Sequence, residues 1–284
     1  MVNLDPANDE LPYECGIDIE DLVTLASVMD ELKLGPNGGM MFCMEYLEKN
    51  MDWLKGKLAA YPGHYFLFDC PGQAELYTHH NAVKGVLAQI DKLGIRLATV
   101  HLIDSHHCTD PTKYVSALLL SLQTMLKLEL PHVNVLSKID LVEQYGRLGT
   151  SGFLSPYPPN SPFFFFCLDL AFDIEYYSEV MDLEYLVQML DNDVFGKKYH
   201  GLNKALCELV EDFNLVGFAT LNIEDKESIL DLLKVIDKAN GYMYGYKDEA
   251  KAQYMAPTQE KSDPSLYRLF YLFMNSFDWT SLAV

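Results

Sequence analysis

Four short runs of strand-forming residues, each followed by a polar side chain, constrain the fold of this chain more than any other feature of its sequence. The runs cover residues 65–68, 97–103, 133–136 and 215–221. Their apolar residues are nearly continuous rather than alternating, which is typical of strands buried on both faces. Strands of that kind belong to parallel sheets, so the sequence predicts a mostly parallel β-sheet.

Helical patterns occupy the segments around and between these runs. Periodic apolar residues and capping signals predict four helices. Three of them cover residues 18–33, 40–59 and 225–240, and the remaining one, third along the chain, begins at Pro111. Thr109-Asp110 supplies an N-cap candidate for the third helix, with Pro in its first turn. Strands separated by helices indicate an α/β fold with a doubly wound sheet.

The residues that follow the predicted strands form a chemically coherent set, because ligands of open α/β sheets bind at the carboxyl ends of the strands. Asp69 follows the first strand and can hold Mg²⁺ through water. Gly72 lets the backbone approach a terminal phosphate, and the amide of Gln73 can orient an attacking water. The alternative is an ordinary strand followed by a Pro-Gly turn.

A second motif, Ser137-Lys138-Ile139-Asp140, follows the third predicted strand. Guanine presents two adjacent donors, N1–H and the 2-amino group, that the carboxylate of Asp140 can accept together. The stem of Lys138 can pack over the base. The alternative is a solvated turn, and the order of the two motifs along the chain favours a GTPase. Asn222 follows the fourth strand and joins the predicted nucleotide-binding residues.

With these motifs and the tripeptide Gly35-Pro36-Asn37, the chain resembles the GPN-loop GTPases, and most closely the second of their three eukaryotic paralogues. The resemblance covers most of residues 2–245. The stretches that carry it, besides the tripeptide, are 2–8, 11–14, 43–54, 69–76, 100–111, 136–141 and 221–229.

The resemblance implies a role for each matching residue. Asp5 helps to position the attacking water, Asp69 lies on the side of the nucleotide site that holds magnesium, and Gln73 orients the water. Lys138 and Asp140 read guanine. GTP and Mg²⁺ are the implied ligands.

Two further features follow from the same resemblance. Ser137 stands where the family often has Asn, which softens base selectivity. Gly35, Pro36 and Asn37 form a loop that reaches across a dimer towards the partner's phosphates. The rigid φ of Pro36 suits such a loop. The alternative is a turn that closes the preceding helix.

The chain also departs from the family pattern. No G-x-x-x-x-G-K-[ST] motif occurs in its 284 residues, so we expect a sheet of the P-loop NTPase type that lacks its first strand-loop-helix unit. The predicted GTPase domain covers residues 1–245, with an insertion at 149–169, and a variable tail covers 246–284. The alternative function is a non-enzymatic dimerisation fragment, and a weaker alternative is an ATPase.

The amino-acid composition limits the kinds of partner that this chain can bind. The net charge is −20, with 41 acidic against 21 basic residues, which argues against direct nucleic-acid binding. The sequence shows neither a long apolar span nor a signal peptide at its start. We therefore expect a cytoplasmic protein that shuttles to the nucleus. By resemblance, it pairs with sister GPN-loop GTPases and supports assembly and nuclear import of RNA polymerase II, with RNA polymerase III as a further candidate.

Overall fold

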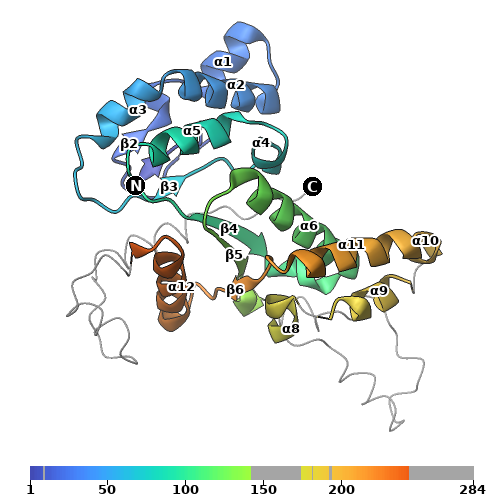
Figure 1. Cartoon of the computed structure of the whole chain (residues 1–284). Coiled ribbons are helices and arrows are strands. Elements are labelled where there is room, and N and C mark those ends of the chain that lie inside the picture. Colours follow the sequence, from blue (N-terminus) through green and yellow to red (C-terminus); the bar gives the residue numbers. More distant parts are fainter. Residues whose placement is uncertain (9, 142–173, 181, 192–193, 243–284) are drawn as a thin grey trace. The chain divides into compact units, whose positions relative to one another are not determined.

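The computed structural model describes residues 1–8, 10–141, 174–180, 182–191 and 194–242 (Figure 1). They form two compact units. The first comprises Met1–Leu97 with Lys127–Glu129, and the second comprises Ala98–Leu126 with the described residues from Leu130 onward. The predicted insertion at 149–169 and the tail at 246–284 lie outside the described residues.

The sheet of the first unit has three short parallel strands. β1 (Val2–Asn3) lies in the centre, between β2 (Ile17–Asp18) and β3 (Phe68–Asp69). The register pairs Asn3 with both Asp18 and Asp69. Three polar side chains therefore meet at the carboxyl edge of this sheet. The strand predicted over 65–68 begins later than expected and extends to Asp69, because only Phe68 and Asp69 pair with β1.

The helices of the first unit differ from those predicted at their starts. The segment expected to be helical from residue 18 begins with β2 and a 3-10 turn, and the helix starts only after Thr24, whose hydroxyl caps the Ser27 N–H at 3.3 Å. The helix expected from residue 40 begins at Pro36 and is interrupted at Asn50. The elements are η1 (Ile19–Asp21), α1 (Leu25–Leu32), α2 (Pro36–Lys49), α3 (Met51–Leu58), α4 (Ala74–Thr78) and α5 (Ala82–Asp91).

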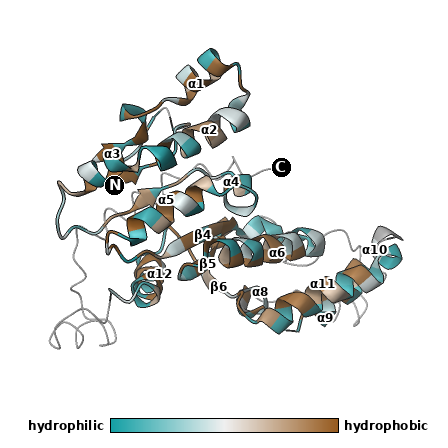
Figure 2. Ribbon diagram, turned by 45° about the horizontal axis from the view of Figure 1, so that its top comes forward, coloured by the Kyte–Doolittle hydropathy of each residue, from teal (hydrophilic) through white to brown (hydrophobic). Residues whose placement is uncertain are grey.

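One hydrophobic core holds this unit together. It joins buried side chains of the strands, such as Val2 and Ile17, to those of α2, α3 and α5. The helices present hydrophobic and hydrophilic residues in turn along their length (Figure 2), as expected for helices that bury one face against a sheet.

The second unit contains a larger parallel sheet in the order β4 (Thr99–Asp104), β5 (His132–Ser137) and β6 (Phe218–Thr220). All three strands overlap the predicted runs, and their parallel pairing is as expected. The register pairs Asp104 with Ser137, so the polar ends of β4 and β5 lie side by side.

Helices pack on both faces of this sheet (Figure 1). On one face, Ile103, Leu136 and Phe218 share a core with α6 and α11. Val135 points to the opposite face by the alternation of a strand, and α12 packs against β5 and β6. The remaining elements of the unit are η2 (Ser105–Thr109), α6 (Pro111–Leu128), α8 (Ile174–Glu179), α9 (Glu184–Leu190), α10 (Val194–Lys198), α11 (His200–Phe213) and α12 (Lys226–Ala239).

The predicted helix caps of this unit are confirmed. The carboxylate of Asp110 accepts from the Thr112 N–H at 2.8 Å at the start of α6. The carboxylate of Asp225 accepts from the Glu227 N–H at 3.0 Å at the start of α12. Each cap stabilises its helix by about 1 kcal/mol, and both helices carry core side chains into the sheet.

Two half-buried histidines, His101 in β4 and His132 at the start of β5, lie side by side on this sheet. The rings of His101 and His132 meet edge to face, with centroids 5.9 Å apart. Within the described residues, the buried Nδ1 atoms of both rings lack hydrogen-bond partners. Burial lowers the pKa of His101, and burial together with the charge of His101 lowers the pKa of His132 to about 4.

Replacing His132 with Gln is expected to make the protein less sensitive to acid. The folded pKa lies below the unfolded value of 6.5, so the stability that neutral His132 contributes is present above that value and is lost as the pH falls towards the folded pKa. The loss reaches roughly 2 kcal/mol at about pH 5. Thermal unfolding of the wild type and of His132→Gln at neutral and acidic pH measures this loss of stability. The control His64→Gln, at an exposed site, is expected to change nothing; equal acid sensitivity of both variants would contradict this assignment.

Candidate functional site

Asp69 is the buried carboxylate at the end of β3. Its side chain is only 6% exposed because the loop between β1 and β2 covers it. One oxygen, Oδ2, accepts hydrogen bonds from the Tyr13 hydroxyl at 2.5 Å and from the Asn8 side-chain amide at 3.3 Å. The loop therefore supplies two donors that hold this carboxylate in a defined orientation.

Asp5 lies in the loop between β1 and β2 that covers Asp69. Its Oδ1 accepts from the Ala7 N–H at 2.9 Å. Asn3, which is fully buried, holds the start of the loop: its Oδ1 accepts from the Asp5 N–H at 3.0 Å, and its Nδ2 donates to the Asp5 carbonyl and to Asp18 Oδ1. The Leu4 N–H donates to the Asp69 carbonyl at 2.7 Å, so the loop is tied directly to β3.

The charge of these two carboxylates is poorly compensated by the protein. Burial raises the pKa of both Asp5 and Asp69, and the charge of Asp69 adds to the rise for Asp5. In the described part of the chain, neither carboxylate forms an ion pair with Lys, Arg or His. Partly desolvated carboxylates without a counter-charge are typical of functional sites.

These residues fit Mg²⁺. The ion prefers oxygen ligands and keeps several waters, so one or two carboxylates plus phosphate oxygens suffice. Asp69 Oδ1 receives no hydrogen bond from any described residue, which leaves it free for such a shell. Among the described residues, no group of three or more His, Cys, Asp or Glu converges.

The turn after β3 leads directly into α4. The Pro71 carbonyl accepts from the Tyr77 hydroxyl at 2.6 Å, which fixes the turn on the helix that follows. Gly72 is exposed, so its backbone is open to a ligand. Gln73 is the N-cap residue of α4, and its carbonyl accepts from the Leu76 N–H at 3.2 Å. Its side chain is half-buried.

The ends of β4 and β5 form a second cluster in the other unit. Lys138 has a left-handed backbone, with φ of +58°, and its ammonium group donates to Asp104 Oδ2 at 2.9 Å. The Ser105 hydroxyl donates to the Lys138 carbonyl at 3.0 Å. The Ser137 hydroxyl donates to the Ile103 carbonyl at 3.0 Å and is fully buried. Ser137 therefore fastens β5 to β4.

Asp140 follows one turn later, and its Oδ1 atom is buried without a hydrogen-bond partner in the described ranges. The Ile139 N–H donates to the Leu221 carbonyl at 3.4 Å, so the end of β6 lies beside this turn. Asn222 Oδ1 accepts from the Glu224 N–H at 2.9 Å and shapes the next turn. The structure thus brings Lys138, Asp140 and Asn222 to one edge of the second sheet.

The tripeptide Gly35-Pro36-Asn37 has a different conformation from the predicted loop. Gly35 is the extended N-cap residue of α2, and Pro36 and Asn37 form its first turn. All three are exposed. Pro suits the first helical turn because the N–H it lacks would have no partner there. Pro36 and Asn37, expected in a rigid loop, are helical, while the role of the tripeptide in a dimer stays a prediction.

Several residues that contact the predicted site residues were not themselves predicted as site residues. Tyr13, Asn8 and Asn3 support the two predicted carboxylates, and Asp104, which the sequence placed at a strand end, pairs with Lys138. Tyr13 lies 56 positions from Asp69. A contact of that separation leaves no pattern in a single sequence.

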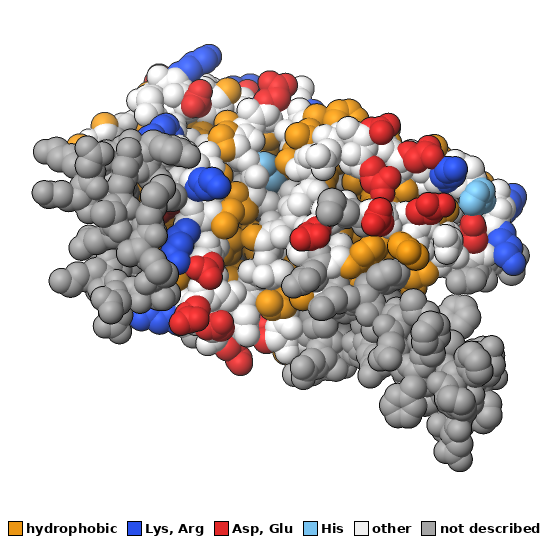
Figure 3. Space-filling model, turned by 60° about the horizontal axis from the view of Figure 1, so that its bottom comes forward, with side chains coloured by type: hydrophobic (Ala, Val, Ile, Leu, Met, Phe, Trp, Pro, Cys, Tyr) orange, Lys and Arg blue, Asp and Glu red, His pale blue; other side chains and the backbone are white. Residues whose placement is uncertain are grey.

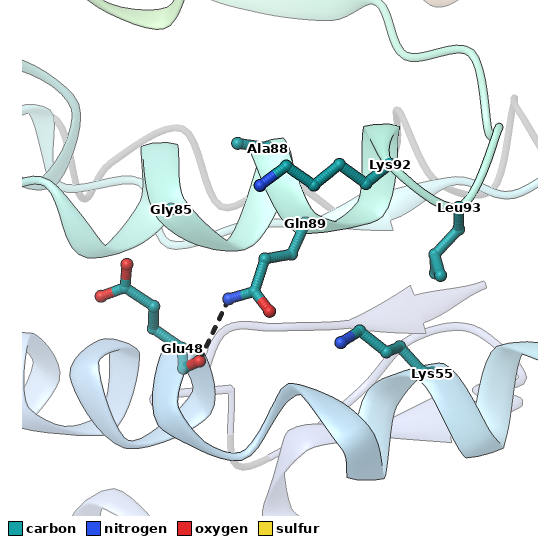
Figure 4. Close-up of a pocket in the computed structure, with 7 residues that line it drawn as sticks. All are labelled: Glu48, Lys55, Gly85, Ala88, Gln89, Lys92 and Leu93. Atoms are coloured by element: carbon teal, nitrogen blue, oxygen red, sulfur yellow. Dashed lines mark hydrogen bonds between the residues drawn. The ribbon is translucent and has the colours of Figure 1, made fainter.

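A separate pocket opens between α2, α3 and α5 of the first unit (Figure 4). Glu48 and Lys55 line one wall, and Gln89 and Lys92 line the other. The Gln89 amide donates to the Glu48 carbonyl at 3.2 Å and bridges the two walls. None of the predicted site residues lines this pocket, so it does not belong to the clusters described above.

Comparison with known proteins identifies relatives over most of the chain. A family profile described as "Conserved hypothetical ATP binding protein" matches residues 1–156 and 163–242. "GPN-loop GTPase 2" of Danio rerio is 52% identical over 255 residues, which are 90% of this chain and 75% of that protein. "GPN-loop GTPase QQT1" of Arabidopsis thaliana is 52% identical over 256 residues, 89% of this chain and 78% of that protein.

A solved structure shows the same fold. It is a GTPase in apo form from Pyrococcus abyssi, with a TM-score of 0.58, 23% sequence identity and coverage of 84% of both chains. The predicted α/β fold with parallel strands is confirmed. None of the helices that the structure describes combines the length and hydropathy needed to cross a membrane.

The sequence motifs, the parallel sheets and the relatives all indicate the same protein family. "GPN-loop GTPase 2" of Saccharomyces cerevisiae is 43% identical over 252 residues, 86% of this chain and 66% of that protein. The predicted likeness to the second eukaryotic paralogue is confirmed by these names. This chain belongs to the GPN-loop GTPase family.

Proposed function

We propose that this chain binds GTP with Mg²⁺ and hydrolyses it. The observation that carries this proposal is the buried Oδ1 atom of Asp140, in the turn after β5, which has no hydrogen-bond partner among the residues that the structure describes. A buried acceptor without a donor is costly, and guanine presents two donors to such a carboxylate. Lys138, whose ammonium group is bound by Asp104, would pack its stem over the base.

The first unit supports the phosphate chemistry. Asp69 is the residue that would hold Mg²⁺, and the backbone of Gly72 would approach the terminal phosphate. When bound, Mg²⁺ would supply positive charge to the phosphate oxygens. The Gln73 amide would orient the attacking water, and Asp5 would accept a hydrogen bond from that water. Gly35, Pro36 and Asn37 would act on the nucleotide of a partner subunit.

Nucleotide competition tests the base preference. The family profile is described as ATP-binding, whereas several relatives are named GTPases. Adenine presents an acceptor, N1, where guanine presents the N1–H donor, so it cannot satisfy Asp140. We expect GTP to displace a fluorescent guanine nucleotide roughly a hundredfold better than ATP does. Equal competition by ATP would show that the guanine assignment is wrong.

A non-enzymatic dimerisation role is the second candidate. The end of α1 and the start of α2 expose large hydrophobic side chains beside Pro36, with Leu32 47%, Leu34 37% and Met41 38% exposed. An apolar surface of this kind fits a protein interface. Dimerisation with no nucleotide binding under any condition would favour this role over hydrolysis.

The proposed cellular role is assembly and nuclear import of RNA polymerase II, and by extension RNA polymerase III, together with sister GPN-loop GTPases. Acidic, basic and hydrophobic side chains are all visible on the face shown in Figure 3, and the net charge of −20 suits protein partners better than nucleic acid. The proposed location is the cytoplasm, with shuttling to the nucleus. Depletion of the protein should leave polymerase subunits in the cytoplasm; an unchanged nuclear distribution would contradict this role.

A further inference from the structure

Tyr13 makes the shortest contact with the Asp69 carboxylate. It comes from the loop between β1 and β2, is only 8% exposed, and donates its hydroxyl to Asp69 Oδ2 at 2.5 Å. A hydrogen bond from a neutral donor to an ionised acceptor is strong and directional. Tyr13 therefore restrains the position of a carboxylate that lies on another strand.

The arrangement of donors is asymmetric. Asn8 donates to the same oxygen, Oδ2, at 3.3 Å, and the described chain offers no hydrogen bond to Oδ1. The terminal torsion of an aspartate is broad and easily rotated. Two donors on one oxygen hold that torsion and leave the other oxygen directed away from the protein donors.

We propose that Tyr13 is a positioning residue that holds Asp69 so that its free oxygen, Oδ1, faces the magnesium shell of the bound nucleotide. This inference rests on the proposed function. Residues that orient a metal ligand through a hydrogen bond commonly change metal affinity by about 10- to 100-fold when they are removed. Asn8 assists through its longer bond to the same oxygen.

The test compares nucleotide affinity with and without the ion. The dissociation constant of mant-GTP is measured in Mg²⁺ and in EDTA for the full chain and for Tyr13→Phe, which removes only the hydroxyl. The dissociation constant in EDTA divided by that in Mg²⁺ reports how much Mg²⁺ strengthens binding. We expect the ratio to fall about tenfold in Tyr13→Phe, with affinity in EDTA unchanged. Asn8→Ala, at a partly exposed site, is expected to lower it about threefold because its bond is longer.

Tyr114→Phe is the matched control. It removes another buried hydroxyl, which donates to the Tyr177 carbonyl at 2.7 Å in the other unit. It is expected to lower the unfolding temperature and to leave the ratio unchanged.

The possible outcomes distinguish a failure of the inference from a failure of the proposed function. Equal weakening in Mg²⁺ and in EDTA by Tyr13→Phe would show a merely structural role and overturn the inference alone. A wild-type ratio near one would remove the magnesium role and overturn the inference as well. A wild-type chain that binds no mant-GTP in either condition would overturn the proposed function, and the inference with it.

Discussion

Asp140→Asn is expected to weaken GTP binding by roughly a hundredfold, or about 2.7 kcal/mol, and to create binding of xanthosine triphosphate. The Asp140 Oδ1 atom is buried without a partner in the described residues, so guanine would complete its hydrogen bonding. An asparagine keeps one acceptor and gains a donor. The donor faces the 2-amino group of guanine unfavourably, but it matches the 2-carbonyl oxygen of xanthine.

Fluorescent-nucleotide competition with GTP and xanthosine triphosphate measures this exchange of preference. The matched control is Asp225→Asn, because Asn caps a helix as well as Asp does and Asp225 caps α12. The control is expected to bind both nucleotides as the wild type does. Unchanged GTP affinity in Asp140→Asn would remove the base-reading role. A loss of both nucleotides together would indicate damage to the turn rather than a change in recognition.

The second unit was the better predicted half of the fold, for a physical reason. The strands β4 and β5 are six residues long each, which is long enough for burial to impose a recognisable apolar run. The caps Asp110 and Asp225 act within three residues of their own positions, so their signal is local. Local signals of this kind are present in a single sequence.

The first unit was predicted less well because its signals are not local. β1 and β2 are two residues long each, too short to show a period. The segment from Asp18 has helical periodicity, yet pairing of Ile17 and Asp18 with β1 overrides it. Tertiary pairing decides such cases.

The candidate site divides in the same way. Asp69, Lys138, Asp140 and Asn222 could be predicted as site residues because strand ends mark ligand sites in open sheets. Tyr13 was missed because its contact with Asp69 depends on a loop folding back over another strand. A tyrosine in a loop carries no mark of that contact before the fold is known.

Asp69→Asn is expected to stabilise the protein without nucleotide and to abolish the effect of Mg²⁺. Burial raises the pKa of Asp69, so the folded state favours the protonated form. The stability contributed by this group is present below the unfolded pKa of about 3.9, and it is lost as the pH rises through the folded pKa. At neutral pH the wild type therefore carries a buried charge that the neutral amide removes, and the unfolding temperature of the variant should be higher.

The loss of function should accompany this gain in stability. Without the carboxylate, Mg²⁺ loses its protein ligand, and we expect mant-GTP to bind about a hundredfold less tightly in Mg²⁺, with affinity in EDTA unchanged or improved. The stability difference from wild type should shrink as the pH falls through the raised folded pKa of Asp69, where the wild-type carboxyl becomes protonated, and it should be smallest below the unfolded pKa of about 3.9. Asp52→Asn, at a fully exposed carboxylate, is the control and should show neither effect. A variant that is less stable than wild type at neutral pH would show that Asp69 serves the apo fold through Tyr13 and Asn8. The site would then be built for packing rather than for a cation.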